Sequence, residues 1–372
     1  MCCCLPQGLE AFGPHPRRGA SLVVACALAA AVCLPGSAAA SQTRFTPNSG
    51  KIWHGVSDTG SGRDYRRFNR QVGAHTALMQ SFFHWGVPLT TGALDRWERT
   101  KTRGVLSLST APGGQPEIVT PRQIAMGFSD HYMLRLGSSI KGAGQVVYIR
   151  PFAEMNLHLN PYSAFNADGS PRRGHSTKMF KLAWKRLVLI VRGGNRDRIN
   201  NELRRLGMPR IHRARSNRAR IYRRIGPDRQ LREPRVAFQW MPLTRGSPNV
   251  AGNNPGAYFP GRRWVDWVGT DVYAKFSNRT LWTNLRAFYR RYDRWPFALG
   301  EYGPWDNDQS GGFTRRIHQW SRRRDRVKAL LYFRSVDPEN VFNLQYYPGA
   351  KGALREILNL PQYQGYAPGT RR

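Results

Sequence analysis

The sequence has no cysteine after position 33. All five cysteines lie close to the N-terminus, at Cys2, Cys3, Cys4, Cys26 and Cys33. If the segment that carries them is removed, the remaining chain has no disulfide, no thiol nucleophile and no cysteine metal site. The chain of 372 residues is long enough to bury a sizeable core.

The first forty residues have the composition of a secretory signal peptide. An Arg-Arg pair at 17–18 precedes an apolar run over 19–34, and three alanines at 38–40 provide the small residues that signal peptidase reads. The apolar run is too short for a stable membrane span. We therefore predict that residues 1–40 are removed and that the protein is secreted. A lipoprotein acylated at Cys26 or Cys33 is the alternative, although neither cysteine follows a convincing lipobox.

Acidic residues are scarce. The chain has 58 Lys and Arg against 23 Asp and Glu, which gives a formal net charge of +35 at pH 7. Such a surplus usually marks a protein that meets nucleic acid, an anionic membrane or an acidic polymer. The sequence carries no nucleic-acid-binding motif, so we expect no nucleic-acid partner. Two interpretations stay open: a solvated surface without a partner, and a surface that meets an acidic polymer or the cell envelope.

No internal repeat is visible, and from about residue 50 short apolar runs alternate with longer stretches of helical period. This alternation is typical of βα units that build a parallel sheet. The predicted strands are Lys51–Ser57, Ala77–His84, Gly104–Thr110, Gln145–Glu154, Arg235–Met241, Val265–Tyr273, Phe297–Tyr302 and Ala329–Ser335. Eight strands are the right number for a closed barrel, so we predict an α/β protein with a (β/α)8 TIM-barrel fold, in one catalytic domain over 41–372.

Helices are predicted between these strands, at Pro121–Ile140, Ser176–Val191, Thr280–Tyr292 and Gly312–Arg322. The first has Thr120 as N-cap before a proline, and the second stops at Gly193-Gly194. One long connection, residues 195–235, carries fourteen arginines against four acids. Because it joins a helix to the next strand, we expect this Arg-rich insertion at the N-terminal face of the barrel, away from the active-site mouth.

Two predicted strands end in an isolated carboxylate. The fourth runs into Arg150-Pro-Phe-Ala-Glu154-Met-Asn156, and the seventh into Gly300-Glu301-Tyr302-Gly303. A purely structural strand would avoid a carboxylate there, and C-terminal strand ends line the catalytic mouth of a barrel. We therefore expect Glu154 and Glu301 to face one cleft. The alternative for the first motif is a structural Glu154 paired with Arg150.

These two motifs, together with the run Trp264–Tyr273, resemble glycoside hydrolase family 26, a clan A family whose best-known members are β-mannanases. The resemblance covers roughly residues 50–360 and is specific at the three motifs. It implies that Glu154 is the acid/base, that Glu301 is the nucleophile, and that Tyr273 holds the nucleophile. We expect no cofactor and no metal, since no cluster of His, Asp and Glu has ligand spacing.

Two departures concern residues that shape the sugar-binding subsites in that family. Ala153 stands where the family usually has histidine, and Asn156 leads into Leu-His-Leu-Asn instead of a glycine and a tryptophan. What the resemblance implies is a secreted retaining hydrolase that cleaves a β-linked polysaccharide, β-mannan or a related polymer, by double displacement. The sugar and its linkage stay open.

Aromatic and polar residues around the two glutamates are the predicted substrate-binding groups. They are Arg150, Asn156, Trp240, Tyr273, Tyr302 and Trp305. Tyr302 and the two tryptophans offer flat apolar surfaces for sugar rings, while Arg150 and Tyr273 are expected to keep Glu301 ionised. We expect a monomer that acts on polysaccharide. The alternative from another functional class is a non-catalytic carbohydrate- or polyanion-binding barrel at the cell surface, against which the presence of both glutamates argues.

Overall fold

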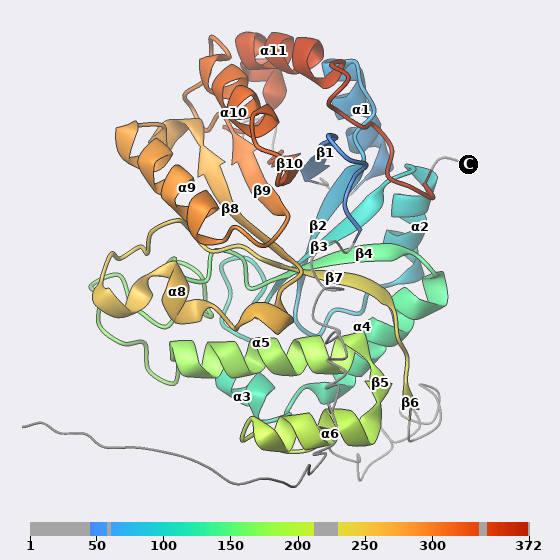
Figure 1. Ribbon diagram of the computed structural model, residues 1–372, viewed down its shortest axis with the longest axis vertical. Helices are drawn as coiled ribbons and strands as arrows, with labels where there is room; N and C mark the ends of the chain where they lie inside the picture. The colour runs from blue at the N-terminus through green and yellow to red at the C-terminus, as the bar shows by residue number, and fades with distance from the viewer. Residues whose placement is uncertain (1–44, 58–60, 212–229, 335–340, 371–372) are drawn as a thin grey trace, which may run out of the picture. The chain divides into compact units, whose positions relative to one another are not determined.

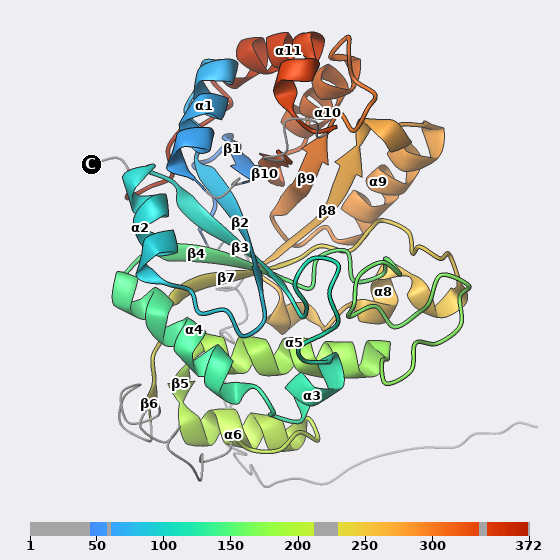
Figure 2. The same ribbon diagram turned by 180° about the vertical axis from the view of Figure 1, so that it is seen from behind.

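The protein is described by a computed structural model over residues 45–57, 61–211, 230–334 and 341–370, so the predicted signal segment lies outside the described residues. Parallel strands close into a barrel in the order β1-β10-β9-β8-β7-β4-β3-β2 (Figures 1 and 2). They are β1 (Trp53–Ser57), β2 (Leu78–His84), β3 (Arg103–Ser109), β4 (Val146–Pro151), β7 (Arg235–Trp240), β8 (Trp267–Tyr273), β9 (Phe297–Gly303) and β10 (Val327–Tyr332). The predicted (β/α)8 barrel is confirmed, and each predicted strand overlaps one barrel strand.

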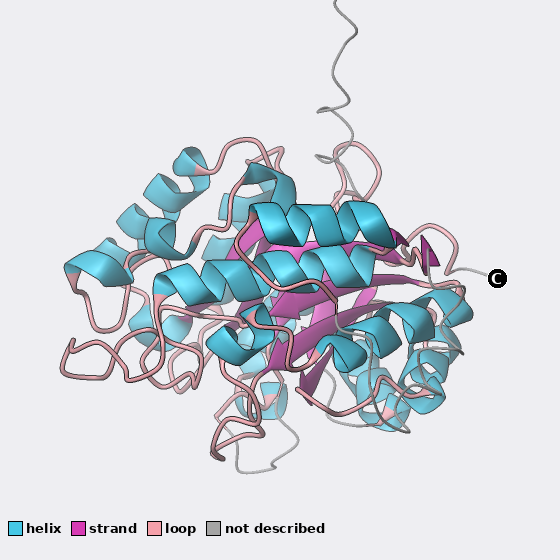
Figure 3. Cartoon of the chain, turned by 90° about the horizontal axis from the view of Figure 1, so that it is seen from below, coloured by secondary structure: helices cyan, strands magenta, loops and turns pink. Residues whose placement is uncertain are grey.

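Helices surround the strands on the outside of the barrel (Figure 3). They are α1 (Gly62–Val72), α2 (Thr91–Arg99), α3 (Pro121–Ala125), α4 (Asp130–Ala143), α5 (Thr177–Arg192), α6 (Arg196–Arg205), α8 (Pro255–Tyr258), α9 (Arg279–Arg291), α10 (Gly312–Arg322) and α11 (Pro348–Leu358). Capping residues determine where several of these helices begin. At the start of α5, for example, the Ser176 side chain accepts a hydrogen bond from the Met179 N–H. None of the helices in the described part of the chain has both the length and the apolarity needed to cross a bilayer.

The single helix predicted over Pro121–Ile140 is wrong: α3 and α4 are separate. The chain breaks at Gly127, which has a φ of 85°. A Cβ at this position would lie 2.7 Å from a terminal guanidinium nitrogen of Arg186, a fully buried residue of α5. Arg186 uses the space to bind Asp130 at the start of α4, with Nε 2.7 Å from Oδ1. A buried ion pair between helices therefore interrupts a segment whose local pattern favours one helix.

The Arg-rich insertion leaves the barrel where α5 ends and returns at the start of β7. Its base is closed by two short antiparallel strands, β5 (Gly194–Asn195) and β6 (Gln230–Leu231), and α6 follows β5. The described ends thus adjoin the N-terminal end of β7, as the predicted strand order requires. Residues 212–229, which include Arg213, Arg215, Arg218 and Arg220, lie outside the described residues.

The interior of the barrel is apolar near the strand starts and polar toward the strand ends. At the start of β1 and β8, the rings of Trp53 and Trp267 stack with centroids 6.5 Å apart, and Tyr148 meets Trp267 edge to face. Farther along the strands, buried Gln80, Arg150 and Asp271 follow. The barrel interior is therefore aromatic at the N-terminal ends of the strands and polar toward their C-terminal ends, where the active sites of TIM-barrel enzymes lie.

Candidate active site

A cleft of about 670 Å³ opens at the C-terminal ends of the strands, and both predicted catalytic glutamates line it. Its walls come mainly from β2, β3 and β4 and the loops after them. Among the described residues that line it, the charged ones are Arg150, Glu154 and Glu301. Apart from His84, the rest of the lining is apolar, small or uncharged polar, which is unusual for a chain with a formal net charge of +35.

A β-bulge turns Glu301 into the barrel. On β9, Leu299 pairs with Thr270 and Glu301 pairs with Asp271, so Gly300 is the extra residue. Ala298 belongs to the interior cluster, whereas Leu299 and Tyr302 pack in the layer between strands and helices. Strict alternation after Ala298 would send Glu301 outward, and the bulge reverses its direction.

Only glycine fits at the bulge. A Cβ on Gly300 would lie 2.3 Å from the Met241 sulfur, 2.8 Å from Asp271 Oδ1 and 3.1 Å from Arg150 Cζ. The missing side chain therefore makes room for the Arg150 guanidinium next to the Glu301 carboxylate.

Three donors hold the Glu301 carboxylate. Arg150 lies 2.5 Å from Oε1, the Gln80 amide donates to the same oxygen at 3.1 Å, and the Tyr273 hydroxyl donates to Oε2 at 2.5 Å. Burial, followed by the charge of Glu301, raises the pKa of Tyr273 well above its usual value, so this phenol stays a donor at neutral pH. The Glu301 carboxyl group is thus held in place, while its side chain, 13% exposed, still faces the cleft.

Glu154 lies in a strained turn after β4, not in the strand itself. The predicted fourth strand extends to Glu154, but β4 ends at Pro151, and Phe152 and Glu154 have φ values of 53° and 50°. The Glu154 N–H donates to the Met241 carbonyl at 2.8 Å, and the Asn160 amide donates to the Glu154 carbonyl at 2.9 Å. These bonds hold a conformation that non-glycine residues rarely adopt, which is a frequent property of functional sites.

The environment of Glu154 favours its protonated form. Burial is the largest cause and the nearby Glu301 charge adds to it, raising the pKa of Glu154 to about 7, although Arg150 and a hydrogen bond with Asp271 act in the opposite direction. The two glutamates therefore have different surroundings: Glu301 is held by a cation and two neutral donors, whereas the raised pKa of Glu154 lets it keep a proton near neutral pH.

Asp271 is a central residue that the sequence analysis missed. It is 7% exposed, lies opposite Glu301 on β8 and forms a buried ion pair with Arg150. One guanidinium thus serves two carboxylates, and Asp271 orients it toward Glu301. Its position two residues before Tyr273 at the end of an apolar strand was the available signal. Gln80, a polar residue in the middle of predicted strand 2, was missed in the same way.

Three predicted substrate-binding residues lie elsewhere. Trp240 and Tyr302 are fully buried in the layer between strands and helices, where Trp240 packs on Phe259 and Tyr302 hydrogen-bonds His54 at 2.6 Å. Asn156 is also fully buried, and its amide group bonds the backbone N–H and carbonyl of Leu243. None of the three offers a free surface, so their assignment to substrate binding is wrong. Each instead stabilises the framework of the site.

Trp305 remains a candidate sugar platform. It is partly exposed, follows β9, and its ring meets the Tyr273 ring edge to face with centroids 5.0 Å apart. In the cleft itself, Phe82 and Leu159 are lining residues with 50% and 75% of their surface exposed. These two apolar residues were not predicted, because nothing in the local sequence distinguishes an exposed strand-end phenylalanine from a core one.

Within the described residues, no three His, Cys, Asp or Glu side chains are grouped as a metal site would require. The cleft does hold a pair of glutamates in different surroundings, with Glu301 among three hydrogen-bond donors and Glu154 at a buried position that raises its pKa. It can support acid/base and nucleophilic chemistry by carboxyl groups alone.

The barrel is similar to solved glycoside hydrolases of family 26. Bacillus subtilis mannanase man26 superposes with a TM-score of 0.51 at 15% identity, over 87% of this chain and 88% of that chain. A Cellulomonas fimi endo-β-1,4-mannanase double mutant gives 0.54 at 12% identity, over 85% and 72%. The Podospora anserina GH26-CBM35 β-(1,4)-mannanase gives 0.50 at 13% identity, over 87% and 65%.

These likenesses confirm the resemblance that the three sequence motifs indicate, at the level of the fold. No family sequence model matches the chain, and no curated protein matches it in sequence. The chain therefore has a glycoside hydrolase fold of the kind found in family 26 mannanases, and its activity has to be argued from its own residues.

Proposed function

We propose that the chain is a secreted retaining glycoside hydrolase that cleaves a β-linked polysaccharide, β-mannan or a related polymer. The observation that carries this proposal is that two carboxyl groups in one cleft differ in their burial and in their hydrogen-bond partners. Glu301 accepts hydrogen bonds from Arg150, Gln80 and Tyr273, while the pKa of Glu154 is raised to about 7. A nucleophile needs donors that hold its carboxylate in place, and a general acid needs a carboxyl group that keeps its proton.

The mechanism has two steps. In the first, a Glu301 oxygen attacks the anomeric carbon, and Glu154 gives its proton to the departing glycosidic oxygen, which leaves a glycosyl ester on Glu301. In the second, Glu154, now ionised, takes a proton from water as the water oxygen attacks the same carbon and releases Glu301. Both substitutions invert the carbon, so the product retains the original configuration.

The neutral lining of the cleft supports a neutral sugar polymer as substrate. Apart from His84 and the three charged residues that belong to the catalytic group, the walls offer apolar faces such as Phe82 and uncharged polar groups such as the Gln115 amide. Product analysis on mannan, glucomannan, xylan, mixed-linkage glucan and an anionic exopolysaccharide tests this. A non-catalytic binder would retain one of these polymers and release no product from any.

The separate roles of the two glutamates can be tested with activated substrates. Glu301→Ala should be inactive on polymer and on aryl glycosides alike, because every leaving group needs the nucleophile. Glu154→Ala should lose roughly 10²- to 10⁴-fold on polymer. It should still form the glycosyl ester from an aryl glycoside whose leaving group departs unprotonated.

Azide should then speed turnover by Glu154→Ala, since azide attacks the ester without a general base. Rescue of Glu301→Ala with an inverted product would reverse the two assignments. Wild-type rates in both variants would end the hydrolase proposal.

Secretion is part of the proposal and rests on residues 1–40. N-terminal sequencing of the protein recovered from the medium should begin at Ser41. Recovery of a chain that keeps its first forty residues inside the cell would contradict this part, without bearing on the chemistry.

A further inference from the structure

The segment that includes α10 and the four residues after it carries many arginines and few acids. From Gly312 to Arg326 the basic residues are Arg315, Arg316, Arg322, Arg323, Arg324 and Arg326, and the acid is Asp325. Two hollows flank the helix, one on the side of α11 and one on the side of α9, and Arg316 and Gln319 line both. They lie in the helical layer outside the barrel, away from the cleft that holds Glu154 and Glu301.

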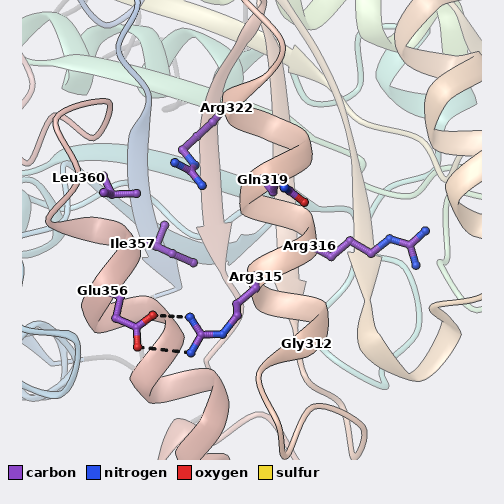
Figure 4. Close-up of a pocket in the computed structure, with 8 residues that line it drawn as sticks. All are labelled: Gly312, Arg315, Arg316, Gln319, Arg322, Glu356, Ile357 and Leu360. Carbon is purple, nitrogen blue, oxygen red and sulfur yellow. Dashed lines mark hydrogen bonds and ion pairs between the residues drawn. The ribbon is translucent and has the colours of Figure 1, made fainter.

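The hollow between α10 and α11, of about 570 Å³, is partly neutralised (Figure 4). Arg315 reaches across to Glu356 of α11 and forms an ion pair with it. Arg322 lies farther along the same side, and Arg316 extends to the opposite side of α10. The unneutralised charge is therefore directed mainly toward α9.

The hollow between α9 and α10, of about 400 Å³, is lined by four arginines and two tryptophans. The arginines are Arg286, Arg316, Arg323 and Arg324. The Arg316 Cζ lies 4.2 Å from the ring centre of Trp282, and the Arg324 Cζ lies 4.3 Å from that of Trp320. Stacking on indole rings holds these two guanidinium groups in place before any ligand arrives.

None of these four arginines forms an ion pair with an acid of the described residues. Burial lowers the pKa of Arg324, and the charges of Arg286 and Arg323 lower it further. The cations are thus close enough to repel one another. Mutual repulsion between fixed cations is relieved when an anion binds among them.

Two kinds of anionic partner fit this hollow poorly. Single-stranded nucleic acid binds by stacking its bases on open aromatic faces, but guanidinium groups already cover Trp282 and Trp320, which are 2% and 7% exposed. A membrane-binding face usually adds exposed apolar side chains, and the large exposed apolar residues of the described chain lie outside α9, α10 and α11. Carboxylate and sulfate groups match the planar guanidinium fork directly.

We infer that the α9–α10 hollow is a second carbohydrate site, which binds a linear acidic polysaccharide through carboxylate or sulfate groups. This inference goes beyond the proposed hydrolase activity and does not depend on it, because the catalytic cleft has a neutral lining and lies elsewhere. An acidic glycan bound on the outer helices leaves the cleft open, so the site can hold the protein on an anionic matrix while the cleft takes a neutral polymer.

The test measures binding, not turnover. The full chain and a variant with Arg286, Arg316, Arg323 and Arg324 all changed to Gln are titrated with labelled oligogalacturonate, a sulfated oligosaccharide and neutral mannooligosaccharide. The matched control also removes four positive charges, from exposed residues of α2, α3, α4 and α5 on the other side of the barrel (Figures 1 and 2). It carries R99Q, R122Q, K141Q and K178Q.

We expect the hollow variant to bind the acidic oligosaccharides roughly tenfold to hundredfold more weakly at about 0.15 M salt, and the control to lose less than threefold. Whichever of the uronate and the sulfate binds more tightly identifies the anionic group. A set of four Arg→Lys changes keeps the charge and loses the fork, so it should bind with an intermediate affinity. Equal weakening of the hollow variant and the control would overturn the proposal, because it would show only general charge attraction.

Two further outcomes also test the proposed polysaccharide site. Site-dependent binding of a DNA oligonucleotide that is tighter than binding of either acidic glycan would replace the polysaccharide by nucleic acid. Thermal melting of each variant checks folding, and turnover of a neutral substrate should be unchanged in the hollow variant. A folded hollow variant that keeps wild-type affinity for both acidic glycans contradicts the site outright.

Discussion

Asp271 and Glu301 lie opposite each other on β8 and β9, and one guanidinium, that of Arg150, binds both carboxyl groups. The bulge at Gly300 produces this relationship, since it points Glu301 inward at the position of its cross-strand neighbour. Asp271 does not line the cleft. It acts as a positioning residue, which fixes the cation that fixes the proposed nucleophile.

Asp271→Asn should lower kcat by up to about 10²-fold, because a misplaced Arg150 holds Glu301 less well. KM should change little, since Asp271 does not meet substrate. The defect should appear in formation of the glycosyl ester from an activated aryl glycoside, and azide should not relieve it. This pattern separates Asp271 from Glu154. An unchanged rate of ester formation would contradict the positioning role.

Removing Arg150 should damage the fold as well as the chemistry. Arg150→Met leaves Asp271 buried without its cation, which should cost about 3–5 kcal/mol of unfolding free energy. Arg150→Met with Asp271→Asn in the same chain should recover part of that loss and remain inactive. Urea unfolding of the three variants measures the coupling. Additive losses would show that the two side chains do not depend on each other.

The raised pKa of Glu154 predicts the alkaline limit of activity. A general acid must be protonated, so kcat/KM should fall above about pH 7, approaching tenfold per pH unit. An aryl glycoside that needs no protonation should not show this fall in the first step. A polymer rate that is constant from pH 6 to 9 would contradict the assignment of Glu154 as acid.

The same group makes a prediction about stability. A carboxyl whose pKa is raised from 4.5 to about 7 in the folded state stabilises the fold at low pH, and this contribution is lost as the pH rises through that window. Glu154→Gln carries no charge at any pH. It should therefore unfold later than wild type at pH 8, by on the order of 2 kcal/mol, and at about the same urea concentration at pH 5. A variant less stable than wild type at pH 8 would contradict the sign.

A buried chain of hydrogen bonds behind the site predicts the acid limit of stability. His54 and His318 both bond the Tyr302 hydroxyl, at 2.6 and 3.0 Å, and His318 also bonds the Tyr363 hydroxyl at 2.5 Å. Burial lowers the pKa of His54 to about 3 and that of His318 well below its usual value. The unfolded chain binds protons near pH 6.5 where the folded one does not, so stability is lost as pH falls below about 6.5.

His318→Gln should lower stability at pH 7 by about 1–3 kcal/mol, because two buried hydroxyls lose a well-placed partner. Its stability should fall less steeply below pH 6.5, by about 1.4 kcal/mol per pH unit, the contribution of one proton. Melting temperatures from pH 7 to 4.5 give the two slopes. Parallel slopes for variant and wild type would show that His318 titrates normally.

Local pattern was sufficient to predict the barrel and to place the two glutamates in one cleft at its end. Apolar runs ending in Glu154 and Glu301 mark strand ends, and strand ends of a barrel meet at one face. It was insufficient where the side of the strand to which a side chain points depends on tertiary contacts. The bulge at Gly300 leaves no alternation signal, so Glu301 and Tyr302 were both assigned to the cleft, although they point to opposite sides of β9.

Burial explains the other differences. Asn156 and Trp240 are residue types that often meet sugars, but one binds Leu243 and the other packs on Phe259 and Tyr292. Asp271 was missed for the opposite reason, since an aspartate within an apolar strand gives no sign of which cation it will meet. The sequence therefore predicts which residues lie at the strand ends. Tertiary packing determines which of these side chains are exposed to the cleft.

Trp305 and Trp240 are both predicted to bind sugar rings, but they lie in different surroundings. Trp305 is partly exposed beside Tyr273, whereas Trp240 is fully buried among Phe259, Phe288 and Tyr292. Trp305→Ala should raise KM for oligosaccharides about fivefold to thirtyfold, the loss expected when an apolar face worth about 1–2 kcal/mol is removed. Its melting temperature should change little, because removal of a partly exposed ring leaves no closed cavity in the core.

Trp240→Phe is the matched control, since it keeps an aromatic ring and removes volume from a packed layer. It should lower the unfolding free energy by about 1–3 kcal/mol and leave KM unchanged. KM from initial rates on a soluble oligosaccharide, together with urea unfolding of both variants, checks the pair. If Trp240→Phe raises KM while Trp305→Ala does not, the sugar stacks on the β7 side of the barrel. The substrate would then bind at a different position relative to Glu301 from the one proposed. If neither changes KM, the exposed faces of Phe82 and Leu159 in the cleft become the surfaces on which the sugar rings rest.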